Sequence, residues 1–143
     1  MRDSPLPSKE FLREHYLAVA LDSESRQKVE ALADYEEIRG DHVTLAFPND
    51  GDTFAQNWIP GNRLLGDIVE METIGMYTTP DIQVLLVSID GSTHRPFDGG
   101  LFHVTVSKRT GTPSVSANDV LEGPPAKRLK LTLRGKIAWL DKH

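Results

Sequence analysis

The chain has 143 residues, of which 38% are hydrophobic and 26% are charged, and its formal net charge is -5. This length and composition fit one globular domain with a buried core, so we expect residues 1–143 to form a single domain. The acidic balance argues against a long nucleic-acid duplex as a partner, because such binding needs many Lys and Arg contacts to phosphate. The chain has no cysteine, which excludes disulfide bonds and thiolate chemistry.

The sequence contains no apolar run long enough to span a membrane. Residues 1–10 hold charges and two prolines where a signal peptide would have its apolar centre. We therefore expect a cytoplasmic protein that does not contact a membrane, and we expect it to be a monomer.

The hydrophobic pattern and the turn residues predict strands over residues 15–21, 41–47, 66–78, 81–89, 101–107 and 128–140, helices over 23–37 and 116–121, and one short helical turn within 52–65. Asp22 stands at the N-cap position of the first helix, and Gly40 is expected to end it. The strand over 81–89 is continuously apolar, so we expect it to be central and covered on both faces.

Two short strings repeat one pattern, a His and a Thr two residues apart within an apolar run. They are His42-Val43-Thr44-Leu45 and His103-Val104-Thr105-Val106. Side chains alternate between the two faces of a strand, so each His shares a face with its Thr while the apolar residues point the other way. If the two strands are neighbours, two imidazoles and two hydroxyls line one groove. These groups suffice for acid and base catalysis on a phosphodiester without a metal or another cofactor.

The order strand-helix-strand occurs in the first third of the chain and again in the last third, with one His-Thr pair in each. We interpret this as a weak internal duplication and predict an α+β fold. Two such halves packed side by side would place the His-Thr strands at the centre of a concave antiparallel sheet, with the helices on its outer side.

The motifs His42-Val43-Thr44-Leu45-Ala46-Phe47 and Phe102-His103-Val104-Thr105-Val106-Ser107 resemble the two signature motifs of the two-histidine (2H) phosphoesterase superfamily. Its members include cyclic nucleotide phosphodiesterases and RNA 2′,3′-cyclic phosphodiesterases. The resemblance extends over the strand and helix before the first motif and the hairpin before the second. It implies a bilobal fold and a metal-independent cyclic phosphodiesterase. Residues 48–66 and 90–101 are shorter than the helical segments of many members, and whether they form lids is open.

The resemblance implies that His42 is the acid and His103 the base in opening a cyclic phosphate to a 2′-phosphate. The reaction needs one neutral imidazole that takes a proton from water and one protonated imidazole that gives a proton to the leaving ribose oxygen. The ordinary histidine pKa of about 6.5 suits both roles. The hydroxyls of Thr44 and Thr105 would donate hydrogen bonds to the phosphate oxygens. The same groups could also act on a 2′-5′ or 3′-5′ linkage.

Candidate substrate contacts beyond these four residues are Ser107, the last residue of the second motif, Lys108, which directly follows it, and Tyr77, whose ring could stack on a base. Phe47 and Phe102 are expected in the core instead. The basic residues of the last strand alternate with leucines and are expected to face water.

Two classes of function remain open. The first is a phosphodiesterase acting on a nucleotide, a cyclic nucleotide or oligonucleotide, or an RNA end. The second is a non-catalytic module that binds the same ligands. The sequence contains no P-loop, Rossmann glycine pattern or metal-ligand cluster, so kinase and metallohydrolase activities have no support.

Overall fold

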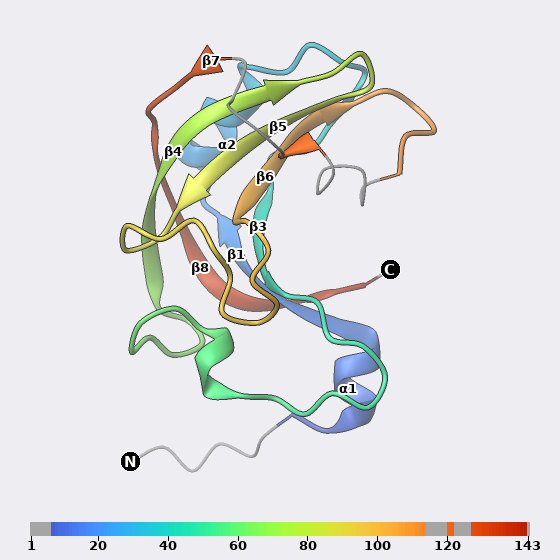
Figure 1. Cartoon of the computed structure of the whole chain (residues 1–143), viewed down its shortest axis with the longest axis vertical. Coiled ribbons are helices and arrows are strands. Elements are labelled where there is room, and N and C mark those ends of the chain that lie inside the picture. The colour runs from blue at the N-terminus through green and yellow to red at the C-terminus, as the bar shows by residue number, and fades with distance from the viewer. Residues whose placement is uncertain (1–6, 114–119, 122–126, 143) are drawn as a thin grey trace.

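The computed structural model describes residues 7–113, 120–121 and 127–142. These residues form an α+β structure built on one eight-stranded sheet, in which all paired strands run antiparallel. The order across the sheet is β2-β6-β5-β4-β8-β1-β3, and β7 pairs with β4 (Figure 1). The elements in chain order are α1 (Lys9–Glu14), β1 (His15–Leu21), α2 (Ser23–Glu30), β2 (Glu37–Ile38), β3 (His42–Ala46), the 3-10 helix η1 (Gln56–Trp58), β4 (Ile68–Thr78), β5 (Ile82–Ser88), β6 (His103–Lys108), β7 (Lys127–Arg128) and β8 (Thr132–Asp141).

The sheet curls until its two ends meet. β3 stands at one end of the order and β6 next to the other end, yet the two strands contact each other (Figure 1). The segment 37–46 makes this closure. The backbone N–H groups of Arg39 and Gly40 donate to the carbonyls of Val106 and Thr105 on β6, and the residues from His42 onward pair with β1. The backbone therefore crosses from one end of the sheet to the other at Gly40, whose φ is +83°.

One face of the long strands points into a single apolar cluster. Its buried members include Leu17, Val19, Val43, Leu45, Met71, Leu85, Val87, Val104, Val106, Leu133 and Ile137. Helix α2 adds Val29 to this cluster and packs against β8 and β6. The His and Thr side chains of β3 and β6 have the opposite parity, so they project from the other face of the sheet.

Several local predictions are confirmed. β1 has the predicted bounds, and the Asp22 side chain caps α2 by accepting a hydrogen bond from the N–H of Ser25 at 2.8 Å. The turn within 52–65 is η1, and β4 and β5 form the predicted hairpin. Six of the seven residues of β5 are buried, as expected of a strand covered on both faces.

The first helix was predicted to reach residue 37 but ends at Glu30. The buried side chain of Gln83 supplies the reason, because it binds the backbone just beyond that end. Its Nε2 donates to the carbonyl of Leu32 at 3.2 Å, and its Oε1 accepts from the N–H of Asp34 at 2.8 Å. These bonds hold the chain along the sheet instead of in a further helical turn.

The last strand was predicted as one unit over 128–140 but is divided into β7 and β8. The Thr73 side chain on β4 occupies the gap. Its hydroxyl donates to the carbonyl of Leu129 at 2.6 Å and accepts from the N–H of Leu131 at 2.8 Å. On β8 the side chains of Thr132, Arg134 and Lys136 are exposed, in agreement with the expectation that this face meets water.

The predicted placement of the His-Thr strands at the centre of the sheet is wrong. β3 is an end strand, and β5 and β4 lie between β6 and β8, so the last third of the chain does not repeat the β1-α2-β3 arrangement of the first. Helix α1, capped by Ser8, was not predicted. The helix predicted over 116–121 falls mainly outside the described residues. Within the described part of the chain, no helix is long and apolar enough to cross a membrane.

Replacing Gly40 by alanine should lower the free energy of unfolding by about 2–4 kcal/mol, because a positive φ strains an L-residue and the new methyl group would overpack the core. A Cβ at this position would lie 2.7 Å from Cγ1 of Val29. Gly51→Ala is the matched control, since Gly51 has a φ of +89° but no heavy atom within 4 Å of the added Cβ. Urea denaturation measures both losses. Equal losses would show that Val29 does not restrict this crossing point.

Candidate active site

The two His-Thr pairs line one cavity of about 550 Å³ on the face of the sheet opposite the main core. His42 and Thr44 enter it from β3, and His103 and Thr105 enter it from β6. The cavity is also lined by Tyr16, Arg39, Asp41, Phe47, Arg95, Asp98, Asp141 and Lys142. The closure of the sheet thus brings together two pairs of side chains that are distant from each other in sequence.

His42 is held from both sides of its ring. Its Nδ1 lies 2.9 Å from Oδ1 of Asp41, and its Nε2 lies 3.3 Å from the hydroxyl of Tyr16. The hydrogen bond with His42 lowers the pKa of Asp41 in spite of partial burial. Burial, followed by the charge of Asp41, raises the pKa of Tyr16, so the phenol keeps its proton.

His103 has a different environment. Its Nδ1 lies 2.9 Å from the carbonyl of Leu101, which can only accept a hydrogen bond, so Nδ1 carries the proton and Nε2 of the neutral ring is an acceptor. Burial lowers the pKa of His103 and outweighs the opposing effect of the Leu101 bond, and the charges of Arg95 and His42 lower it further. The ring is therefore neutral near pH 7 and able to accept a proton.

The environments of the two histidines are thus unequal. One imidazole touches a carboxylate, and the other is buried against a backbone carbonyl with an arginine nearby. An acid and a base that work in the same step need such a difference, because equivalent imidazoles would share one protonation state.

Sequence reasoning missed several groups of the cavity. Tyr16 and Asp41 adjoin His42, and Arg39 precedes it on the segment that closes the sheet. Arg95 comes from the loop 90–101, which is rich in turn residues. Among these residues, only Asp41 could have been proposed from the sequence, since it directly precedes a motif histidine.

Phe47 was expected in the core but lines the cavity with 48% of its surface exposed. It follows the end of β3, so strand alternation no longer sets its direction. Its ring packs against Tyr16, and Nζ of Lys142 lies 4.6 Å from the ring centroid. Phe102, in contrast, is 1% exposed within the core, as predicted.

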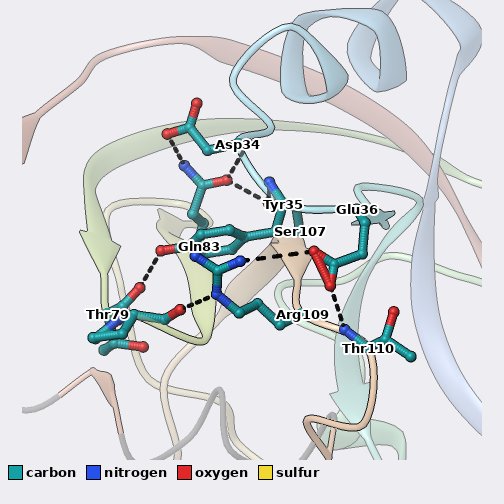
Figure 2. A network of polar contacts seen from close by, with 9 residues as sticks. Asp34, Tyr35, Glu36, Thr79, Gln83, Ser107, Arg109 and Thr110 are labelled. Atoms are coloured by element: carbon teal, nitrogen blue, oxygen red, sulfur yellow. Dashed lines mark hydrogen bonds and ion pairs between the residues drawn. The ribbon is translucent and has the colours of Figure 1, made fainter.

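The three expected substrate contacts Ser107, Lys108 and Tyr77 do not line the cavity. Ser107 does not share the face of His103, because the register shift between Gln83 and Val84 breaks the alternation of β6 after Thr105. Its side chain is fully buried on the face of Gln83, to which its hydroxyl donates beneath the segment that follows α2. Figure 2 shows this network, in which Asp34, Tyr35 and Glu36 are tied to β5 and to the end of β6.

The Nζ of Lys108 donates to the carbonyl of Thr112 at 2.7 Å, and the side chain is 9% exposed. Tyr77 is 6% exposed and belongs to a second apolar cluster with Ile82 and Val84. Packing and local hydrogen bonds therefore account for both positions, and neither is retained as a substrate contact of this cavity.

The other described histidines lie outside this cavity. His15 stacks on Phe11 and lies 3.0 Å from Asp141, and His94 is an exposed loop residue. Within residues 7–113, 120–121 and 127–142, no group of three His, Cys, Asp or Glu side chains is arranged to hold a metal ion. No family model, curated protein or solved structure matches this chain.

Stability should decrease as the pH falls through and below the ordinary histidine pKa of about 6.5. Because the pKa of His103 is lowered in the folded protein, the unfolded chain takes up a proton at a higher pH than the folded protein does. The neutral imidazole therefore contributes fully to stability above the ordinary histidine pKa, and this contribution is lost as the pH falls to the lowered pKa. His103→Gln should flatten this part of the profile, measured by urea unfolding between about pH 8 and pH 5. His94→Gln controls for the loss of a histidine. Parallel profiles for the parent and His103→Gln would contradict the expectation.

Proposed function

We propose that this protein is a metal-independent phosphodiesterase that hydrolyses a 2′,3′-cyclic phosphate, at an RNA end or on a nucleotide, or a phosphodiester of a related short or cyclic oligonucleotide. The proposal includes the bilobal two-histidine fold that the motifs resemble. The observation that carries it is the meeting of His42, Thr44, His103 and Thr105 in one cavity. The cavity volume of about 550 Å³ falls within the range of small-molecule sites.

In the proposed reaction, water attacks the phosphorus atom and gives its proton to Nε2 of His103. The bond from phosphorus to the ribose 3′ oxygen breaks, and that oxygen takes a proton from His42, so the product is a 2′-phosphate. The hydrogen bond from Nδ1 of His103 to Leu101 supports the role of base, because it leaves Nε2 unprotonated in the neutral ring. The contact with Asp41 supports the role of acid for His42.

Thr44 and Thr105 are proposed to donate hydrogen bonds to the non-bridging oxygens of the phosphate. Both side chains share a strand face with their histidine and line the same cavity. Donors placed in this way stabilise the charge that develops on the phosphate in the transition state. In the free protein the Tyr16 hydroxyl occupies Nε2 of His42, and the leaving oxygen of the substrate would replace it.

His42→Ala and His103→Ala should each lower the turnover of 2′,3′-cyclic AMP by about a hundredfold or more, since a positioned acid or base contributes about 10² to 10⁴. Thr44→Ala and Thr105→Ala should cost about ten- to a hundredfold, because each removes one donor and leaves proton transfer intact. The double histidine variant should lose much less than the product of the single losses. His94→Ala, on an exposed loop, is the control for surface histidine removal.

Steady-state kinetics measures these losses, and calorimetric binding of the product adenosine 2′-monophosphate accompanies them. Folded histidine variants that turn over substrate like the parent would refute the catalytic assignment. Binding of the nucleotide by the parent without any turnover would identify the protein as the non-catalytic module instead.

Hydrolysis should persist in excess EDTA and depend on pH as a bell-shaped curve, because both proton transfers use imidazoles. The limb on the acid side should lie below the ordinary histidine pKa, since burial lowers the pKa of His103. Initial rates across the pH range, with and without chelator, provide the measurement. Activity that disappears with EDTA and returns with zinc or manganese would disprove the metal-independent mechanism.

A further inference from the structure

We propose that Arg95 is an additional phosphate-binding residue of this site, and that Asp98 occupies its guanidinium in the free protein where the phosphate of a ligand binds in the complex. This inference rests on the proposed function, because it assigns the ligand phosphate to the cavity of His42 and His103.

The first observation is the geometry of the pair. Nε of Arg95 lies 2.9 Å from Oδ1 of Asp98, and Nη2 lies 2.9 Å from Oδ2, so the guanidinium binds the carboxylate with two parallel hydrogen bonds. A phosphate group accepts the same two-point contact. Both residues line the cavity, but the Arg95 side chain is 11% exposed and that of Asp98 is 42% exposed. The cation is therefore the fixed partner, and the carboxylate is the one that can move into solvent.

The second observation is that the loop carrying Arg95 is attached to the catalytic strand. His94 forms an isolated β-bridge with Leu101, and the carbonyl of Leu101 is the acceptor for Nδ1 of His103. Arg95 is close enough for its charge to contribute to the lowered pKa of His103. The guanidinium is thus held beside the imidazole that is proposed to activate water.

The third observation is that the loop backbone is shaped around this guanidinium. The N–H of Arg95 donates to the carbonyl of Gly100 at 2.6 Å, and the N–H of Gly100 donates to Oδ1 of Asp98 at 2.8 Å. A Cβ at Gly100 would collide with Nη2 of Arg95. Burial raises the pKa of Asp98, but the bonds from Arg95 and Gly100 outweigh it and keep the carboxylate ionised.

These contacts suit a phosphate that gains charge during the reaction. A guanidinium in a partly buried cavity stabilises such charge more strongly than a hydroxyl does, because its hydrogen bonds are charge-assisted. Asp98 keeps the buried cation paired until a ligand arrives. The Asp98 carboxylate and the ligand phosphate then compete for the same guanidinium of Arg95, so removing the charge of Asp98 should strengthen ligand binding.

The test uses the full chain, calorimetry with adenosine 2′-monophosphate, and turnover of 2′,3′-cyclic AMP. Asp98→Asn keeps an oxygen for the Gly100 bond and loses the negative charge, so affinity should rise about two- to fivefold, the range of an exposed ion pair. Arg95→Gln should weaken binding about tenfold or more and lower turnover by about 10² to 10³, as expected when a charged donor to the transition state is lost.

The pair Arg63–Asp90 provides a matched control. Its two contacts are 2.7 and 2.8 Å, its side chains are 24% and 51% exposed, and neither residue lines the cavity. Asp90→Asn should leave affinity unchanged, and thermal unfolding verifies that each variant is folded.

If Asp98→Asn binds adenosine 2′-monophosphate as Asp90→Asn does, or more weakly, the Arg95–Asp98 pair only fastens the loop and the inference is overturned. If turnover requires both histidines but is unaffected in Arg95→Gln, the inference fails while the proposed function stands. A parent protein that neither binds nor hydrolyses these nucleotides refutes both.

Discussion

The backbone hydrogen bonds of the segment 37–46 are shared between two ends of one sheet, and the cavity depends on that sharing. Arg39 and Gly40 bind β6, and the residues from His42 onward bind β1. A strand that stayed with one neighbour would leave the sheet open, with β3 and β6 apart. The positive φ of Gly40 permits the crossing, and the close approach to Val29 shows why no side chain fits there.

The same crossing explains the unequal surroundings of the two histidines. Asp41 follows Gly40 directly and is already bound to β1, because its carbonyl accepts from the N–H of Leu21 at 2.9 Å. Its carboxylate lies beside Nδ1 of His42. His103 begins β6, where the preceding Leu101 offers only its carbonyl. Two similar sequence motifs thus acquire different hydrogen-bond partners from the chain that precedes each of them. The proposed division into acid and base is a property of the fold more than of the motifs.

Much of the local structure was predictable because its causes are local. The bounds of β1, the N-cap at Asp22 and the shared face of each His and Thr follow from apolar runs, a capping side chain and strand alternation. The environment of Ser107 was not predictable in this way. Strict alternation would place it on the face of His103, but a register shift opposite Gln83 turns its side chain to the other face. There its hydroxyl binds Gln83 and the N–H of Tyr35, from a segment distant in sequence.

The cavity residues that sequence reasoning missed have the same explanation. Tyr16 reaches His42 because β1 pairs with β3, and Arg95 reaches the vicinity of His103 through a bridge between His94 and Leu101. Neither contact has a spacing that marks it in the sequence. The order of strands was mispredicted for a related reason, because an apparent repeat of strand, helix and strand contains no information about which strands pair.

The position of β8 has a consequence for how the protein folds. It is the last strand in chain order, yet it lies between β1 and β4 and joins them in one sheet. Until β8 pairs, β1 and β4 each present an unpaired edge to solvent, and such edges invite association with other chains. Pairing of residues 15–21 with 135–141 also closes a loop of nearly the whole chain, which slows folding. The pairing of β8 is therefore the step that both covers these two edges and joins the ends of the chain.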